Sequence, residues 1–354
     1  MAKSSYKVLG VMSGTSLDGI DLAECSLEVT EQNVWTYRIG VAETISYPAE
    51  WITRLKEAVH YSEAELETLN IAYTGYLGKV IAQFIDKHTL NKLDAVSSHG
   101  HTILHQPDKG LTLQIGNLPE IAKLVGQTVV CDFRVQDVAM GGQGAPLVPI
   151  GDRMLFGEYD YCLNLGGFAN ISSEENENRI AYDVCPVNIV LNHFANKIGE
   201  PYDPEGRIAR SGKVDKAVLD RLNALTYYSE PAPKSLGLEW VQQNVFPIME
   251  DVNVSVPDLL RTYTEHVAMQ LTSRFYENSK VLISGGGAYN SFLIERLNSL
   301  RDCQLVIPAN NLVEYKEALV FALLGTLRLR DEVNCLASVT GASGDHSSGI
   351  VHFP

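Results

Sequence analysis

Residues 10–23 read GVMSGTSLDGIDLA and decide the fold, because they place a glycine-rich turn between two apolar runs. The first run stops at Ser13 and Gly14, and the second, IDLAECSLEV, alternates apolar with polar residues. Alternation with a period of two is typical of a half-buried strand, so the stretch predicts a β-hairpin around SGTSLDG. Glycines in such a turn let the backbone bend tightly and approach a ligand.

The same turn is rich in groups that can bind an anion. Successive backbone N–H groups in a tight turn form a concave anion site, and the hydroxyl groups of Ser13, Thr15 and Ser16 add donors. Asp18 and Asp21 would be poor neighbours of phosphate unless a magnesium ion, bound through water, lies between. The turn therefore has two interpretations, a phosphate site or a plain hairpin.

Two further glycine turns follow apolar strands, in LNLGGFANIS (163–172) and LISGGGAYN (282–290). A strand–glycine–strand hairpin in each half of the chain is a weak internal duplication and indicates two similar α/β domains. A length of 354 residues also exceeds what one hydrophobic core usually organises. We expect one domain over residues 1–131 plus 331–354 and a second over 132–330, with a nucleotide between them.

Other segments give simpler expectations. Apolar spacing between Pro48 and Leu90 predicts two helices, and LDAVSSHGHTI (93–103) predicts one strand. PEIAKLVG (119–126) predicts a short helix that ends at its glycine. The glycine- and serine-rich GASGDHSSG (341–349) is expected to be a loose tail.

Composition excludes several classes of function. The chain has 28 Lys plus Arg against 43 Asp plus Glu, a formal net charge of −15, which repels nucleic acid and anionic lipid. The sequence contains neither a signal-peptide pattern nor an apolar run of ~20 residues, so we expect a cytoplasmic protein without a membrane partner. Six scattered cysteines without a C-x-x-C pair predict neither a disulfide framework nor a zinc site.

The motifs together resemble, in order and almost end to end, the bacterial anhydro-N-acetylmuramic acid kinase family. The segments that carry the resemblance are GVMSGTSLDGIDLA, SSHGHT, LQIGN, DFRVQDVAMGGQGAPLVP, NLGGFANIS, GEPYDPEGRIA, SGGGAYN and ASVTGASGDHSSG. The resemblance implies two ribonuclease-H-like (actin-like ATPase) α/β domains that flank an interdomain cleft. It also implies ATP as phosphoryl donor, Mg²⁺, and a homodimer.

Site residues follow from the resemblance. It implies that Asp18 faces the metal and that ATP is held by three glycine-rich segments: Gly14, Thr15, Ser16, Leu17, Asp18, Gly19, Ile20 and Asp21; Gly166 and Gly167; and Gly285, Gly286 and Gly287. For the sugar it implies His99 and Asn188, of which Asn188 belongs to the family's catalytic segment.

The catalytic base of the family lies in a D-T-G-P-G-N segment, which corresponds to Asp183-Val184-Cys185-Pro186-Val187-Asn188 here. Asp183 is therefore expected to activate a water molecule, a role that contributes roughly 10²–10⁴-fold to a rate. The residues alone also allow a helix cap at Asp183. Val184, Cys185 and Val187 depart from the family and put side chains where its bare backbone can approach a ligand.

Arg134, in DFR, is expected to bind the sugar. A guanidinium pairs bidentately with a carboxylate such as the lactyl group of a muramic acid, and the alternative is a salt bridge with Asp132 or Asp137. His99, His101 and His105 lack a further ligand at suitable spacing, so they do not predict a metal site. Glu317 matches a family position, and a solvated helix face explains it equally well.

The activity implied by the resemblance is an ATP-dependent sugar kinase. It would open the 1,6-anhydro ring of anhydro-N-acetylmuramic acid with water and phosphorylate the sugar to N-acetylmuramic acid 6-phosphate, in peptidoglycan recycling. Two alternatives remain open. The altered 184–187 segment allows a kinase of the same superfamily for a different anhydro sugar, and it allows a catalytically silent ATP-binding sensor.

Overall fold

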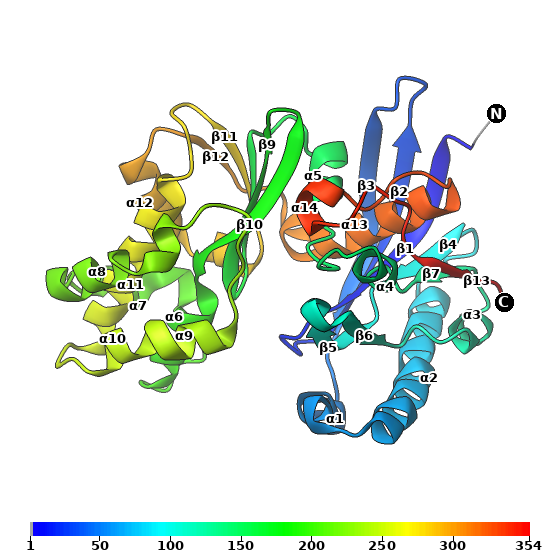
Figure 1. The fold of residues 1–354 in the computed structure, drawn as a ribbon, viewed down its shortest axis with the longest axis horizontal. Coiled ribbons are helices and arrows are strands. Elements are labelled where there is room, and N and C mark those ends of the chain that lie inside the picture. The colour runs from blue at the N-terminus through cyan, green and yellow to red at the C-terminus, as the bar shows by residue number, and fades with distance from the viewer. Residues whose placement is uncertain (1–2) are drawn as a thin grey trace. The chain divides into compact units, whose positions relative to one another are not determined.

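The computed structural model describes residues 3–354, and the chain divides into two compact units. Unit 1 comprises Met1–Leu155 and Tyr315–Pro354, and unit 2 comprises Phe156–Glu314. Each unit is built on its own β-sheet (Figure 1). Among the described residues, no helix has both the length and the apolar character needed to cross a membrane.

The sheet of unit 1 has the strand order β13-β7-β4-β1-β2-β3. Its strands are β1 (Ser5–Ser13), β2 (Ile20–Val29), β3 (Trp35–Ile45), β4 (Ala95–Ser98), β7 (Val129–Cys131) and β13 (Ile350–His352). Strands β1, β2 and β3 form an antiparallel meander, and β4 and β7 continue the sheet parallel to β1. Ser13 pairs with Ile20, which confirms the predicted hairpin.

Helices lie on both faces of this sheet. Leu9 and Val11 of β1 share a hydrophobic core with Leu77 of α2 (Glu63–Lys87). Gly10, which points to the other face, lies against α13 (Asn310–Leu329), because a Cβ built there would clash with the carbonyl oxygen of Ala318. The other helices of the unit are α1 (Ala49–Glu57), α3 (Glu120–Val125), α4 (Val135–Ala139), α5 (Pro149–Leu155) and α14 (Ala337–Thr340).

Unit 2 repeats the same topology. Its sheet has the order β10-β9-β8-β11-β12, with antiparallel β8–β9–β10 and with β11 and β12 parallel to β8. The strands are β8 (Tyr161–Leu165), β9 (Phe168–Glu175), β10 (Asn178–Pro186), β11 (Lys280–Ser284) and β12 (Gln304–Val306). This shared strand order confirms the internal duplication and the expected pair of ribonuclease-H-like α/β domains.

The helices of unit 2 pack around α11, a long helix with one buried face. Its buried face carries Leu260, Tyr263, Val267 and Leu271, and these side chains join the same core as the sheet residues Leu163 and Ile283. The helices are α6 (Asn188–Asn196), α7 (Arg207–Ser211), α8 (Lys216–Asn223), α9 (Leu238–Asn244), α10 (Phe246–Glu250), α11 (Val256–Thr272) and α12 (Ser291–Leu300).

The units divide at different residues from those expected. Residues 132–155 and 315–330 belong to unit 1, where the sequence placed them in the second domain. These segments belong to unit 1 because they pack against it and against each other. Helix α5 contacts β3, and a Cβ built on Gly151 of α5 would lie 2.5 Å from the Val320 side chain of α13. Helix α13 begins in unit 2 and leaves helical geometry at Tyr315 (φ −110°, ψ 17°), where the units divide.

Two local predictions were wrong. The strand expected over 93–103 is split at Gly100, whose φ of 71° ends β4, and β5 (His101–Gln106) then pairs with β6 (Leu111–Ile115) in a separate sheet. The loose tail expected over 341–349 is packed instead. The backbone of His346 forms an isolated antiparallel β-bridge with that of Cys335. Ser348 is buried and hydrogen-bonded to Phe133 and Asn334.

Candidate active site

The turn between β1 and β2 exposes the groups that the sequence assigned to phosphate. Thr15, Ser16 and Asp18 are exposed, and Gly14 and Asp21 are partly exposed. Leu17 has a φ of 63°, and its N–H donates to the carbonyl oxygen of Gly14 at 3.2 Å. A leucine in the left-handed region is uncommon, and such residues cluster at ligand sites.

Ser13 and Ile20 differ from the other residues of this turn, because their side chains point inward. The Ser13 hydroxyl lies 2.6 Å from the Tyr47 hydroxyl and 2.7 Å from His101 Nδ1. Ile20 is fully buried in the hydrophobic core of unit 1. These two side chains therefore anchor the turn to the interior of unit 1. Only the backbone of Ile20 could contact a ligand.

Three of the predicted glycines have space above them. A Cβ on Gly14 would meet only Ser16, at 3.4 Å or more, and one on Gly167 would meet only Ile189, at 4.0 Å. No described atom lies within 4 Å of a Cβ built on Gly286. Packing within the described chain thus does not require glycine at these positions, and the open space fits a ligand that approaches the backbone.

A Cβ on Gly166 would meet its neighbours only at 3.5 Å or more, whereas Gly19, Gly285 and Gly287 are required by the fold. A Cβ on Gly19 would lie 2.7 Å from the carbonyl oxygen of Ile45, and one on Gly287 would lie 2.7 Å from the Leu165 side chain. Gly285 has a φ of 80°, which favours glycine. These positions turn the chain, and they provide no independent sign of a ligand.

His99 and Arg134 meet in unit 1. Arg134 Nε donates to His99 Nε2 at 2.9 Å, and Arg134 Nη1 donates to the carbonyl oxygen of Gly144 at 2.6 Å. His99 Nδ1 lies 3.0 Å from the carbonyl oxygen of Gly100 and 3.3 Å from that of Ser13, which fixes the neutral tautomer with the proton on Nδ1. Burial, and then the charge of Arg134, hold the pKa of His99 well below its ordinary value.

Among residues 3–354, Arg134 is hydrogen-bonded to His99 and Gly144, and it forms neither of the alternative salt bridges, with Asp132 or Asp137. Asp137 instead accepts a hydrogen bond from the backbone N–H of Gly144 at 2.7 Å. It thereby fixes the residue whose carbonyl oxygen accepts from the Arg134 guanidinium. Burial lowers the pKa of Arg134 to about 10, and the charge of Glu317 opposes that shift. The guanidinium is therefore held in a fixed plane and stays charged at neutral pH.

Glu317 of α13 is only partly exposed to solvent. Burial raises its pKa, the negative charge of Asp21 raises it further, and Lys316 and Arg134 lower it. Glu317 is therefore electrostatically coupled both to the glycine hairpin and to the proposed sugar-binding arginine. Sequence reasoning gave this residue no role, because its neighbours come from distant segments.

In unit 2, the structure brings the second and third glycine turns together. The N–H groups of Val187 and Asn188 donate to the carbonyl oxygens of Gly167 and Gly166, at 2.8 and 3.3 Å. Asn188 Nδ2 donates to the carbonyl oxygen of Leu165 at 3.2 Å, beside the position of Gly287. The amide of Asn188, predicted to bind sugar, thus has a structural partner.

Asp183 lies on β10 at an irregularity, because the pairing with β9 shifts register between Asp183 and Cys185. Its side chain is partly exposed, and one carboxylate oxygen accepts from the N–H of Leu236 at 2.9 Å. Its backbone is fixed on both sides, by Lys234 and by the Tyr227 hydroxyl, at 3.1 and 2.6 Å. Burial raises the pKa of Asp183 above its ordinary value of 3.8.

Asp183 is not the cap of the following helix. Helix α6 begins at Asn188, and its N-cap residue is Val187. Val184, Cys185 and Val187, the departures from the family pattern, are fully buried in the hydrophobic core of unit 2. Their side chains therefore fill the interior and leave the carboxyl of Asp183 accessible.

Comparison with known proteins covers almost the whole chain. The family model described as anhydro-N-acetylmuramic acid kinase matches residues 6–354. The curated anhydro-N-acetylmuramic acid kinase of Vibrio cholerae is 34% identical over 382 residues, which span 98% of this chain and 98% of that protein. That of Idiomarina loihiensis is 32% identical over 362 residues, which span 95% and 96%.

Among solved structures, the activator of the 2-hydroxyisocaproyl-CoA dehydratase from Clostridium difficile, with bound ADPNP, is similar at a TM-score of 0.41. It is 13% identical, and the match covers 90% of this chain and 93% of that one. The family match and the full-length relatives agree with the motifs at residues 10–23, 132–149 and 164–172. The chain belongs to the anhydro-N-acetylmuramic acid kinase family.

Proposed function

We propose that this protein is an ATP-dependent kinase that opens the 1,6-anhydro ring of anhydro-N-acetylmuramic acid and yields N-acetylmuramic acid 6-phosphate and ADP. Full-length family membership supports the substrate and the reaction. The single observation that carries the chemistry is the carboxyl of Asp183, which is partly exposed, fixed by its neighbours and raised in pKa by burial.

The substrate explains why a base is needed. Its O6 is bonded to C1 in the anhydro bridge, so it has no free 6-hydroxyl to attack a phosphoryl group. In our proposal, the Asp183 carboxylate takes a proton from water while the water oxygen bonds to C1. The C1–O6 bond breaks with its electron pair on O6, and O6 then bonds to the γ-phosphorus as the bond to ADP breaks.

The glycine turns support the binding of ATP within each unit. Gly14, Gly167 and Gly286 have open space where a Cβ would lie, and backbone N–H groups in such turns suit phosphate oxygens. Asp18 is an exposed carboxylate in the first turn, which fits Mg²⁺, an ion that keeps several water ligands. Bound Mg²⁺ would neutralise charge on the phosphate groups.

Arg134 and His99 are proposed to bind the sugar. The guanidinium is fixed by two hydrogen bonds and stays charged, so it suits the lactyl carboxylate of a muramic acid. His99 is neutral and serves to orient Arg134. We further propose a cytoplasmic homodimer that takes part in peptidoglycan recycling, as implied by the family.

Release of ADP with a panel of anhydro sugars tests this function. We expect ADP and a phosphorylated product with anhydro-N-acetylmuramic acid, and neither with the same sugar when ATP is omitted. Phosphorylation of another anhydro sugar alone would favour the related kinase. Thermal stabilisation by ATP without a product from any sugar would favour the silent sensor.

A further inference from the structure

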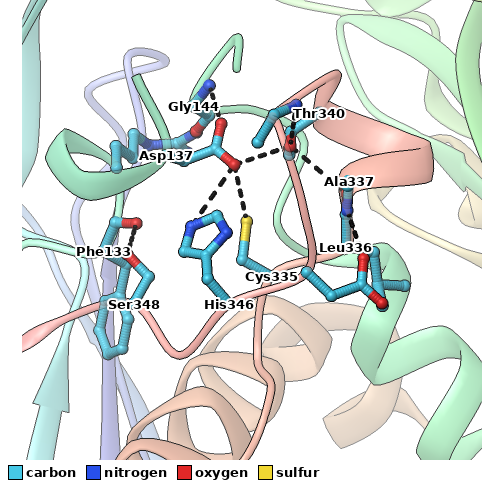
Figure 2. A network of polar contacts seen from close by, with 12 residues as sticks. Phe133, Asp137, Gly144, Cys335, Leu336, Ala337, Thr340, His346 and Ser348 are labelled. Carbon is cyan, nitrogen blue, oxygen red and sulfur yellow. Dashed lines mark hydrogen bonds and ion pairs between the residues drawn. The ribbon is translucent and has the colours of Figure 1, made fainter. Parts of the chain in front are cut away.

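A second cluster of reactive side chains lies in unit 1, outside the residues proposed for catalysis. Asp137 of α4 meets Cys335 and His346 from the C-terminal segment (Figure 2). All three are buried, with exposures of 0%, 1% and 8%. The ligand atoms of the three side chains lie within 4.8 Å of one another.

Hydrogen bonds define the state of the imidazole in this cluster. His346 Nδ1 lies 3.0 Å from the carbonyl oxygen of Gly344, so Nδ1 carries a proton and the neutral imidazole has its lone pair on Nε2. Nε2 is buried, has no hydrogen-bond partner among residues 3–354, and lies 3.6 Å from Asp137 Oδ1. A buried Nε2 that faces a carboxylate oxygen is unfavourable unless a positive charge lies between them, either a proton on Nε2 or a metal ion.

We propose that Asp137, Cys335 and His346 bind one zinc ion. Carboxylate oxygen, thiolate sulfur and imidazole nitrogen are the donors that zinc prefers. Zn–S of ~2.3 Å and Zn–N or Zn–O of ~2.0 Å place ligand atoms of a tetrahedron about 3.3–3.5 Å apart. The structure has Asp137 Oδ1 at 3.1 Å from Cys335 Sγ and at 3.6 Å from His346 Nε2.

The charges of this site balance. On binding, the Cys335 thiol releases its proton to solvent and the sulfur donates an electron pair to the ion, without a change in oxidation state. One thiolate and one carboxylate then neutralise the two positive charges of zinc, which suits a buried position. A water molecule completes the tetrahedron.

The hydrogen bonds that would orient these three ligands are already formed. The Gly344 carbonyl orients the imidazole, and Asp137 accepts from Gly144 N and from the Thr340 hydroxyl, both at 2.7 Å. Such partners orient metal ligands and raise affinity. The carbonyl oxygen of Gly144 also accepts a hydrogen bond from Arg134 Nη1. The ion would therefore fix the C-terminal segment to the loop that holds this arginine. The zinc site itself does not depend on the proposed sugar kinase activity.

Cobalt substitution of the full-length, chelator-treated protein tests the proposal. We expect one equivalent of Co²⁺ to give a thiolate-to-cobalt charge-transfer band in the near ultraviolet, and one equivalent of Zn²⁺ to remove it. Zn²⁺ should also raise the midpoint of thermal unfolding. Cys335→Ser should abolish the band, and His346→Gln should weaken Co²⁺ binding more than about 10-fold.

Cys303→Ser is the matched control, because Cys303 is a half-buried cysteine in unit 2, and this variant should keep the band. The proposal would be overturned if the wild type gave no charge-transfer band, or if Cys335→Ser kept it. If Cys335→Ser does not fold, the wild type and His346→Gln decide the result. Equal Co²⁺ affinity in those two proteins would leave only the metal-free ion pair between His346 and Asp137.

Discussion

At the scale of single residues, Asp183 and Arg134 carry most of the proposed chemistry, and both depend on their surroundings. Asp183 keeps a carboxylate near water while its backbone is fixed, and burial raises its pKa. Arg134 keeps its charge inside a protein whose net charge is −15. The sequence identified both residues through family motifs, but their hydrogen-bond partners come from distant segments and could not be predicted locally.

The raised pKa of Asp183 predicts the pH profile. A general base works only when it is deprotonated, so kcat/KM should fall as the pH drops through this pKa, which lies above 3.8. His101 should not add a limb near neutrality, because burial lowers its pKa to about 4. The profile of kcat/KM, measured where the protein stays folded, should show one acidic limb, and a limb at or below 3.8 would contradict this role.

Arg134→Lys should weaken sugar binding. Lysine keeps the charge but lacks the planar guanidinium, whose separate nitrogens donate to His99 and to Gly144. Because a hydrogen bond to a charged group contributes about 1.5–3 kcal/mol, we expect KM for the sugar to rise roughly 10–100-fold. ATP affinity should stay the same. The control, Arg54→Lys on α1, removes one half-exposed guanidinium and should leave both constants unchanged; equal effects of the two variants would refute the assignment.

At the scale of elements, local signals predicted what local interactions build. The two glycine hairpins, the helices between Pro48 and Leu90 and the helix that ends at Gly126 all formed as expected. The strand splits at Gly100, where the backbone passes close to the carbonyl oxygen of Ile115. A Cβ built on Gly100 would lie only 2.6 Å from that oxygen. The 341–349 segment is ordered by bonds to Phe133 and Asn334, which its own composition does not reveal.

The contact between β1 and α13 predicts a large loss of stability in Gly10→Ala. The new methyl group would overlap the backbone of Ala318, and relief requires the strand or the helix to move. Overpacking of this kind costs about 3 kcal/mol. Gly75→Ala in α2 is the control, because no described atom lies within 4 Å of its Cβ, and it should stabilise by about 0.5–1 kcal/mol. Chemical denaturation measures both, and equal stabilities would contradict the packing.

The open space above Gly286 makes a different prediction. Gly286→Ala should leave the midpoint of thermal unfolding unchanged, because the methyl group meets no described atom within 4 Å. If the nucleotide contacts this backbone, its dissociation constant should rise about 10-fold, which is ~1.4 kcal/mol. Calorimetric titration with a non-hydrolysable ATP analogue measures this effect. Unchanged affinity would place Gly286 away from the nucleotide.

At the scale of the whole molecule, the two units share one strand order, and the family motifs run through both. The sequence could predict this duplication because each unit starts with the same strand–glycine–strand pattern. It could not predict the limits of the units, because α5 and most of α13 pack by tertiary contacts that no composition change marks. The proposed chemistry depends on one carboxyl group, that of Asp183, in a fold that both units repeat.

Asp183→Asn tests this central claim most directly, with Asp215→Asn as its control. Asparagine keeps an acceptor for the N–H of Leu236 but cannot take a proton, whereas Asp215 only caps α8 in the same unit. With anhydro-N-acetylmuramic acid and ATP, we predict that Asp183→Asn loses at least about 100-fold in kcat and keeps its affinity for ATP, while Asp215→Asn stays near the wild-type rate. Near-normal turnover of a folded Asp183→Asn variant would contradict the account.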